Sequence, residues 1–148
     1  MSEEHSPGAC RAARAERVLV VEDQSAVREV LAESLEVLGF APVMAGSGAQ
    51  ALALVEQLHG PLAAAIIDVQ LPDLGGAALG ARLRERQPGL PLVFTSGGRH
   101  TLAELAASAG LAPSGLAGAR LLAKPFGIEA LEAALAEVLG RSAPGSRG

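Results

Sequence analysis

The side chains best placed for chemistry in this sequence each follow a short, largely apolar run. They are Asp68, the acidic pair Glu22-Asp23, Ser96 and Lys124. Runs of this kind are typical of strands covered on both faces, so a charged group at the end of one must face solvent or a cation. We therefore place the chemistry of the chain at these ends, and first of all at Asp68.

The composition singles out some of the same residues. The chain has three aspartates and one lysine, and it otherwise uses Glu and Arg for its charges. Two of the aspartates are Asp23 and Asp68, and the lysine is Lys124. A short carboxylate and a compact ammonium suit a site where geometry is tight, whereas Glu and Arg satisfy a solvated surface. This placement indicates a site rather than chance.

Three carboxylates in one crevice repel each other, and a hard cation with oxygen ligands relieves the repulsion. Mg²⁺ is typical where a phosphoryl group completes the coordination. With its charge neutralised, the Asp68 carboxylate can attack a phosphorus centre, and the transfer then needs cations and donors around the equatorial oxygens. Mg²⁺, Lys124 and the Ser96 hydroxyl would supply them.

Hydrophobic periodicity predicts the elements that bring these residues together. Strands are expected at 18–21, 42–45, 63–68, 91–95 and 119–123. Helices are expected at 25–38, at 49–58, through Leu79 and Leu83 to about 87, at 101–109 and at 128–139. This alternation forces parallel pairing with right-handed crossovers. The predicted fold class is α/β, a doubly wound five-stranded parallel sheet with helices on both faces and its crevice at the carboxyl ends of the strands.

Two local predictions concern the first helix and a later loop. Ser25 is expected to cap the helix and Gly39 to close it. Its buried stripe is expected to comprise Val27, Val30, Leu31, Leu35 and Leu38. Residues 110–118 are rich in Ala, Gly, Pro and Ser, with little to anchor them, so we expect mobility there.

Composition bounds the remaining organisation. Residues 1–16 are predicted to be a flexible arm, 17–140 one domain and 141–148 a disordered tail, with no further domain expected. One cysteine, Cys10, allows no disulfide framework and favours a cytoplasmic setting. A net charge of −4 with no Tyr or Trp argues against direct nucleic-acid binding, and no apolar run is long enough for a membrane span.

Four stretches resemble the response-regulator receiver domains of two-component signalling. They are Val18-Leu-Val-Val-Glu-Asp23, Ile66-Ile-Asp-Val-Gln-Leu-Pro72, Leu90-Pro-Leu-Val-Phe-Thr-Ser-Gly97 and Leu121-Leu-Ala-Lys-Pro-Phe126. Together they cover residues 17 to about 139 in the family's order and spacing. The resemblance implies the strand order 2-1-3-4-5. It also implies that a histidine kinase or phosphotransfer protein phosphorylates Asp68.

The resemblance also implies a set of ligands and neighbours. Asp23 and Asp68 would bind Mg²⁺ directly, the main-chain carbonyl of Gln70 would be a third ligand, and Glu22 would act through water. Ser96 would move to hydrogen-bond the phosphoryl group.

Lys124 would pair with that group, and Pro125 often follows a cis peptide bond in this family. Such a domain is a signalling switch that assists only its own phosphorylation and dephosphorylation, and is not an enzyme acting on an external substrate. It would signal to an unknown output protein through its fourth helix, fifth strand and fifth helix, and it is compatible with a homodimer.

The sequence departs from the family's pattern at two positions. Leu121 stands where an aromatic residue usually rotates inward with the hydroxyl, and Gly75 stands where an Asp is common, which should loosen the turn after Asp68. In addition, Gly97 and Gly98 leave the region beside Ser96 open. Water is therefore expected to reach a phosphoryl group on Asp68 unless Gln70 shields it.

Other interpretations remain open at this point. A receiver excised from a hybrid histidine kinase has the same chemistry. Residues 46–51 fit the G-x-G-x-x-A pattern of a dinucleotide-binding turn, although the pattern belongs to a first βα turn. A haloacid-dehalogenase-type phosphatase would use an Asp nucleophile and Mg²⁺, but would need a second Asp at position 70.

The remaining charged residues have structural explanations. Asp73 is assigned to the turn beside Pro72. His5, His59 and His100 lack partners at metal-ligand spacing. The arginines at 82, 84 and 86 are expected on a solvated helix face and end.

Overall fold

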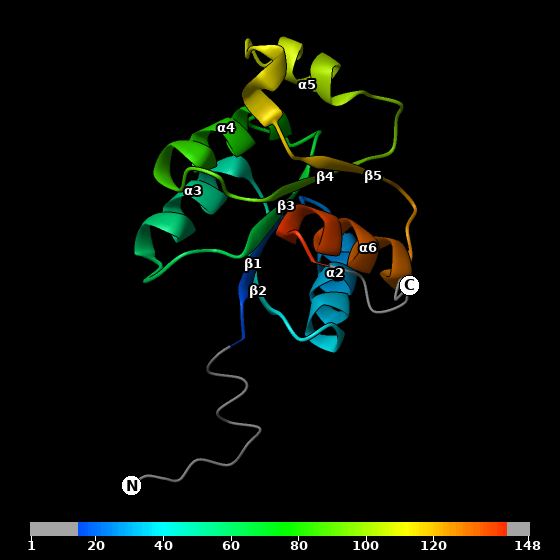
Figure 1. Ribbon diagram of the computed structural model, residues 1–148. Helices are drawn as coiled ribbons and strands as arrows, with labels where there is room; N and C mark the ends of the chain where they lie inside the picture. The colour runs from blue at the N-terminus through cyan, green and yellow to red at the C-terminus, as the bar shows by residue number, and fades with distance from the viewer. Residues whose placement is uncertain (1–14, 142–148) are drawn as a thin grey trace, which may run out of the picture.

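The structure, a computed structural model, describes residues 15–141 and contains one parallel sheet. Its strands are β1 (Arg17–Val21), β2 (Ala41–Ala45), β3 (Ala64–Asp68), β4 (Leu92–Ser96) and β5 (Arg120–Ala123). They lie in the order β2-β1-β3-β4-β5, and every neighbouring pair is parallel (Figure 1). The expected sheet and its order are confirmed, and the strand ends fall within about one residue of prediction.

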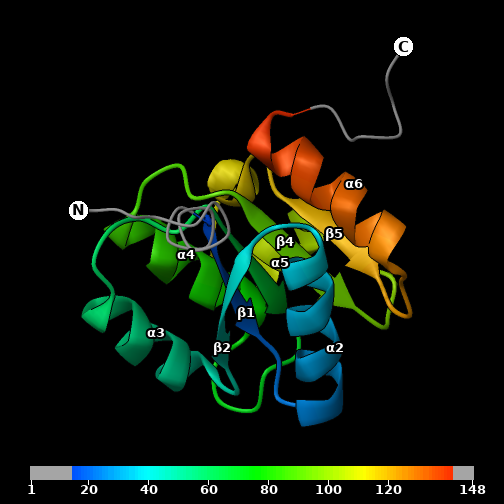
Figure 2. The same ribbon diagram turned by 90° about the horizontal axis from the view of Figure 1, so that it is seen from below.

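Helices cover both faces of the sheet. They are α2 (Ser25–Val37), α3 (Gly48–Gln57), α4 (Gly76–Arg86), α5 (Leu102–Ser108) and α6 (Ile128–Leu139), with a short 3₁₀ helix, η1 (Pro113–Leu116). One face carries α2 and α6, and the other carries α3, α4 and α5 (Figures 1 and 2). The chain runs outward from β1 to β2 and then returns to β3, so the winding reverses between β1 and β3.

Alternate residues of each strand feed the two layers of the core. Val18 and Val20 pack towards α2 and α6, whereas Leu19 faces the layer of α3, α4 and α5. The largest core side chain is Phe94, which lies in that second layer. A Cβ atom on Gly80 would lie 3.0 Å from Cζ of Phe94, so the glycine allows α4 to approach β4 closely.

The first helix differs from prediction at its start and along its stripe. The N-cap residue is Gln24, whose side chain makes no capping hydrogen bond. Ser25 is the first residue of the helix, so the expectation that it caps the helix is wrong. Gly39 closes the helix with φ 94°, as expected. Val30 was expected in the buried stripe, but it is 61% exposed. It faces away from the sheet and lines an open apolar groove together with Phe126.

The segment at 110–118 is better anchored than its composition indicates. It contains η1, and Leu116 is only 1% exposed within the α3–α5 layer, so the expectation that little anchors it was wrong. Arg84 donates from its guanidinium to the carbonyl oxygens of Leu90 (3.0 Å) and Ala117 (2.9 Å). The solvated role expected for Arg84 is therefore also wrong, and its burial lowers the pKa of the guanidinium.

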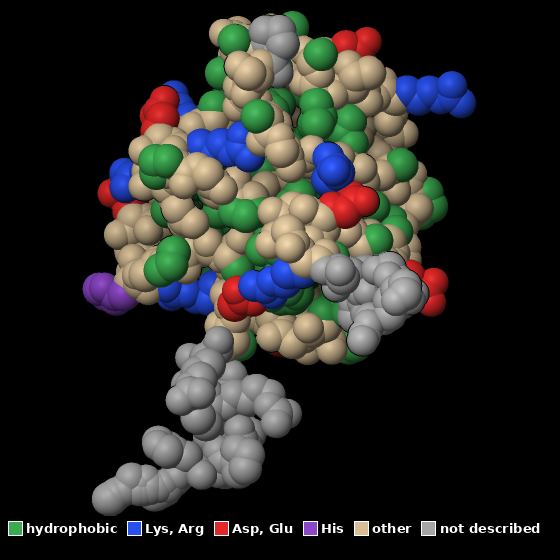
Figure 3. All heavy atoms as spheres, viewed as in Figure 1, with side chains coloured by type: hydrophobic (Ala, Val, Ile, Leu, Met, Phe, Trp, Pro, Cys, Tyr) green, Lys and Arg blue, Asp and Glu red, His purple; other side chains and the backbone are tan. Residues whose placement is uncertain are grey.

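The ends of the described chain meet at the surface. Arg141 pairs with Glu16 at 2.6 Å, and the rest of the expected arm and tail lies outside the described residues. No helix in residues 15–141 combines the length and the apolar character that a membrane crossing needs. On the face that Figure 3 shows, basic and acidic side chains are interspersed and do not form one basic patch.

Candidate functional site

The predicted site residues meet at the carboxyl ends of β1, β3, β4 and β5. Hydrogen bonds of the sheet continue past the strand ends and fix the residues that follow. The N–H of Glu22 donates to the carbonyl of Ala45 at 3.1 Å, and the N–H of Lys124 donates to the carbonyl of Ser96 at 2.8 Å. Parallel pairing with β1 and β4 places the end of β3, and therefore Asp68, between these two positions.

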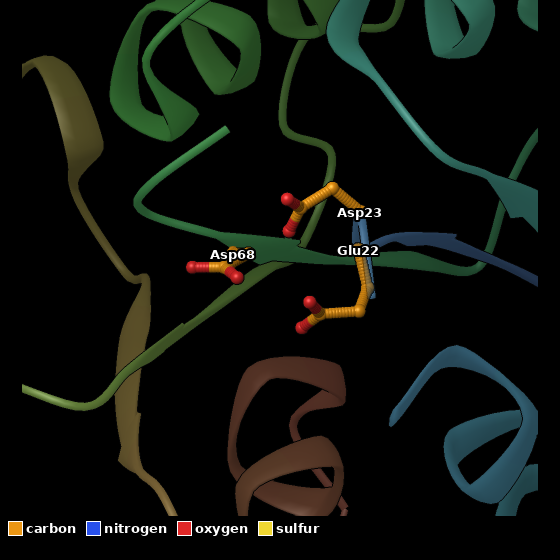
Figure 4. Close-up of side chains that lie close together, drawn as sticks. All are labelled: Glu22, Asp23 and Asp68. Carbon is orange, nitrogen blue, oxygen red and sulfur yellow. The ribbon is translucent and has the colours of Figure 1, made fainter. Parts of the chain in front are cut away.

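Three carboxylates converge at this edge, those of Glu22, Asp23 and Asp68. Each offers an oxygen, and the three oxygens lie within 4.8 Å of one another. Figure 4 shows them approaching the same space from the end of β3 and from the segment after β1. Glu22 and Asp68 are buried, whereas Asp23 is exposed and opens the cluster to solvent. An all-oxygen, multiply charged donor set of this kind fits a hard divalent cation.

Lys124 joins the cluster across the sheet. Its Nζ lies 3.0 Å from Oδ2 of Asp68 and 3.0 Å from Oε1 of Glu22. Partial burial opposes the charge of this side chain, but the two carboxylates outweigh it and raise the pKa of the ammonium group. Lys124 is followed by Pro125 through a cis peptide bond, as the family resemblance implies.

Glu22 is the most deeply buried of the acids, with 1% of its surface exposed. Its Oε2 accepts the N–H of Gln24 at 3.1 Å, and its backbone carbonyl accepts a guanidinium N–H of Arg28 at 2.6 Å. Burial raises the pKa of the Glu22 carboxyl, although hydrogen bonds from Lys124 and Gln24 oppose the rise. Sequence reasoning missed Arg28, whose contact is with a backbone atom and leaves no pattern in the sequence.

Asp68 is hydrogen-bonded through both of its oxygens. Oδ1 accepts the N–H of Gln70 at 2.9 Å, and Oδ2 accepts from Lys124. The side chain of Gln70 is exposed, so the residue contributes through its backbone. These two contacts hold the carboxylate in one orientation at the end of β3.

Ser96 is buried beside the cluster, but its hydroxyl is engaged within its own loop. Oγ accepts the N–H of Gly98 at 3.0 Å and makes a longer contact of 3.3 Å with the carbonyl oxygen of Gly98. The structure therefore places Ser96 at the correct edge of the sheet, but its hydroxyl makes no hydrogen bond to the side chain of Asp68 or Lys124.

Asp73 has a tertiary role that the sequence did not predict. Instead of serving only its own turn, its carboxylate accepts the N–H groups of Gly48 and Ala49, the first two residues of α3. A dinucleotide phosphate bound at residues 46–51 would need such amides, and in this structure a carboxylate already occupies them. The hydrogen bonds from Ala49 and Gly48 lower the pKa of Asp73.

The other candidate residues lie elsewhere. Within the described part of the chain, Glu22, Asp23 and Asp68 form the one metal-type cluster, and neither His59 nor His100 belongs to it. His5 lies outside the described residues. Arg86 pairs with Glu56 on the surface.

Comparison with known proteins agrees with this geometry. The family described as "Response regulator receiver domain" matches residues 18–136. Sensor kinase CckA of Brucella abortus (strain 2308) is 34% identical over 122 residues, which cover 82% of this chain and 12% of CckA. Response regulator MprA of Mycobacterium sp. (strain KMS) is 34% identical over 129 residues, which cover 86% of this chain and 52% of MprA.

A solved structure of similar fold extends the comparison. The response regulator receiver protein from Sinorhizobium medicae WSM419 superposes with a TM-score of 0.72 at 24% identity, covering 86% of this chain and 97% of that one. The chain thus spans about half of MprA and a smaller part of CckA, which are a response regulator and a sensor kinase. The chain belongs to the response regulator receiver domain family of two-component systems.

Proposed function

We propose that this receiver domain is a phosphorylation switch in which Asp68 accepts a phosphoryl group. The observation that carries the proposal is the convergence of three carboxylates and one ammonium group from three separate strand ends. Lys124 lies at hydrogen-bond distance from Asp68 and Glu22, and the acidic oxygens lie within 4.8 Å of one another. Family membership supports the same interpretation.

The proposed reaction transfers a phosphoryl group to a side-chain oxygen. An Asp68 oxygen attacks the phosphorus of a phosphohistidine on the partner, a new O–P bond forms, and the P–N bond breaks. The electron pair of that bond returns to the imidazole nitrogen of the partner. When Asp68 carries the phosphoryl group as an acyl phosphate, Lys124 is free to turn from Oδ2 to a phosphoryl oxygen, where its charge is needed.

The proposed metal is Mg²⁺. Asp23, Asp68 and the main-chain carbonyl of Gln70 would hold it, and Glu22 would act through water. When bound, the ion supplies charge neutralisation at the acidic cluster and at the phosphoryl oxygens. The raised pKa of Glu22 reflects the desolvation of a buried carboxylate, the kind of group that a nearby cation stabilises.

Signal output is proposed to begin at Ser96. Its hydroxyl would leave Gly98 and donate to a phosphoryl oxygen, which moves the start of the loop between β4 and α5. Leu121, half-buried in β5, stands where the family usually has an aromatic residue and would take part in any repacking. The proposed output face is therefore α5, β5 and α6, through which the domain would bind an unknown output protein or a second copy of itself.

The proposed phosphodonor is a histidine kinase or a phosphotransfer protein in the cytoplasm. The relatives of this chain occur both as response regulators and within sensor kinases, and the same chemistry serves both contexts. In either context the domain assists its own phosphorylation and dephosphorylation and turns over no external substrate.

Intact-mass spectrometry after incubation with acetyl phosphate and Mg²⁺ tests the proposal. Wild type should gain one adduct of about 80 Da, the mass of one phosphoryl group, which then decays. Asp68→Asn should gain none, and omission of Mg²⁺ should abolish the adduct on wild type. An adduct that persists in Asp68→Asn would exclude Asp68 as the acceptor, and sustained release of phosphate without a protein adduct would favour a phosphatase.

A further inference from the structure

The carboxylate of Asp73 completes the cap of a helix to which it does not belong. Its Oδ1 accepts the N–H of Gly48 at 3.0 Å, and its Oδ2 accepts the N–H of Ala49 at 2.9 Å. The next amide, that of Gln50, is bound by the hydroxyl of Ser47 at 3.1 Å. The first turn of a helix leaves these amides without partners inside the helix, so Asp73 and Ser47 together satisfy the start of α3.

The loop that carries Asp73 is also fixed at its base, against the backbone of Asp68. The N–H of Gly76 donates to the carbonyl oxygen of Val69 at 3.1 Å, and a Cβ atom on Gly76 would lie 2.3 Å from the carbonyl oxygen of Asp68. On the other side of the loop, a Cβ atom on Gly48 would lie 3.0 Å from Cβ of Leu74. Two glycines thus allow close contact on opposite sides of the loop.

Between these two anchor points lies Gln70. Its N–H donates to Oδ1 of Asp68 at 2.9 Å, so its position and that of the phosphoacceptor are linked. Every residue of the 69–75 loop is exposed or half-buried, and Val69, Leu71 and Leu74 pack against the α3–α5 layer with partly buried side chains. The hydrogen bonds between Asp73 and the start of α3 add to the packing of Leu74 and hold the middle of the loop in place.

We propose that Asp73 is a positioning residue of the site. It holds the 69–75 loop against the start of α3 and thereby keeps the backbone of Gln70 at its place beside Asp68. The α3 helix supplies none of the pocket side chains, yet its N-terminus supports the pocket through this carboxylate. The expected effect of Asp73 on Mg²⁺ affinity rests on the proposed function, whereas its expected effect on the order of the 69–75 loop does not.

Amide hydrogen exchange followed by NMR tests the structural part. In Asp73→Ala, exchange of the Gln70 and Gly76 amides should accelerate by about tenfold or more, because the loop loses its outer anchor. The matched control is Ser47→Ala, which removes the other cap of the same helix without touching the loop. It should accelerate exchange at the start of α3 and leave Gln70 and Gly76 at the wild-type rate.

Titration of the same variants with MgCl₂, followed by amide shifts, tests the functional part. The Mg²⁺ affinity should fall by about threefold to tenfold in Asp73→Ala and stay at the wild-type value in Ser47→Ala. The expected loss is below the roughly 10–100-fold typical of groups that contact a metal ligand directly, because Asp73 acts on Gln70 only through the loop. Should Asp73→Ala fail to fold, Asp73→Asn retains one acceptor oxygen and should show the same pattern at smaller amplitude.

Two results would overturn the proposal. One is unchanged exchange at Gln70 and Gly76 in the Asp73 variant, which would make Asp73 a helix cap only. The other is an equal effect of Ser47→Ala at those two amides or on Mg²⁺ affinity. If the wild type itself binds no Mg²⁺, the proposed metal site fails, and the exchange comparison still decides the role of Asp73.

Discussion

The ammonium nitrogen of Lys124 lies 3.0 Å from Oδ2 of Asp68, although 56 residues separate them in the chain. The same nitrogen lies 3.0 Å from Oε1 of Glu22, a carboxylate that is 1% exposed. One cation therefore separates two acids that would otherwise face each other with little solvent between them. This relationship makes Lys124 a structural residue of the domain as well as a candidate partner of the phosphoryl group.

Replacing Lys124 by Met should destabilise the domain in magnesium-free buffer, because it leaves the Glu22 and Asp68 carboxylates without their shared cation. Removing one partner of a buried ion pair costs about 3–5 kcal/mol, and we expect about 1–3 kcal/mol here because Lys124 is 24% exposed. Urea unfolding followed by circular dichroism measures the change. The control is Arg120→Met, which removes an exposed partner of Glu137 and should cost about 1 kcal/mol or less. Equal losses in the two variants would contradict the prediction.

Gly76 and Gly75 are adjacent, but the same substitution should destabilise the domain much more at Gly76 than at Gly75. In Gly76→Ala the new Cβ would lie 2.3 Å from the carbonyl oxygen of Asp68, so the loop or α4 must shift, at a cost of about 3 kcal/mol. Gly75 is the N-cap residue of α4 with φ −59°, and a Cβ atom added to it would meet no other atom within 4 Å. The smaller entropy loss of Ala on folding is therefore opposed by its weaker preference for the N-cap, and Gly75→Ala should change stability by about 0.5 kcal/mol or less. Thermal unfolding of both variants is the measurement, and a neutral Gly76→Ala would be the contrary outcome.

The convergence of Asp68, Glu22 and Lys124 was predictable because it follows from topology. Apolar runs that alternate with helices predict a parallel sheet. The carboxyl ends of its strands lie at one edge of the sheet, so the residues that follow the strands meet at that edge. The tertiary roles of Asp73 and Arg84 were not predictable in this way. Each side chain binds backbone groups of a distant segment, and no periodicity in the sequence records such a contact.

The burial of Val30 and Leu116 also differed from prediction, because burial depends on the elements that pack over a side chain. Val30 fits the apolar stripe of its helix by spacing, but the sheet does not extend over it. Leu116 lies in a segment of poor periodicity, yet the layer of α3–α5 encloses it. Spacing gives the direction of a side chain, whereas its burial depends on what lies opposite.

Ser96→Ala should separate phosphorylation from the conformational response. The hydroxyl binds Gly98 and is not in contact with Asp68, so acetyl phosphate should still phosphorylate the variant. The equilibrium constant between the switched and unswitched conformations of the phosphorylated protein should fall about tenfold, since one hydrogen bond to a charged group contributes roughly 1.4 kcal/mol or more. Amide shifts of α5 and β5 report that population. Ser96→Thr, which keeps the hydroxyl, is the control, and a full response in the alanine variant would remove Ser96 from the switch.

Acid titration should reveal the cap made by Asp73. Its pKa lies below the ordinary value of 3.8, so the folded state binds this proton less tightly than the unfolded state does. The stabilisation is therefore complete above that value and is lost as pH falls through the lower pKa of the folded state. The difference in melting temperature between wild type and Asp73→Asn should shrink below about pH 4. A difference that stays constant from pH 6 to pH 3 would show that the charge of Asp73 does not matter.

The lifetime of the phosphorylated protein should depend on the side chain of Gln70. This side chain is exposed beside Asp68, and the neighbouring Gly97 and Gly98 offer no side chains of their own to exclude water. Gln70→Ala keeps the backbone N–H that binds Asp68 but removes the side chain, so dephosphorylation should accelerate by about threefold, equivalent to ~0.7 kcal/mol of barrier. Decay of the phosphoryl adduct, timed by intact mass, gives the rate. Gln24→Ala, an exposed change near the same pocket, serves as the control, and identical lifetimes for wild type and Gln70→Ala would show that water reaches the site without passing Gln70.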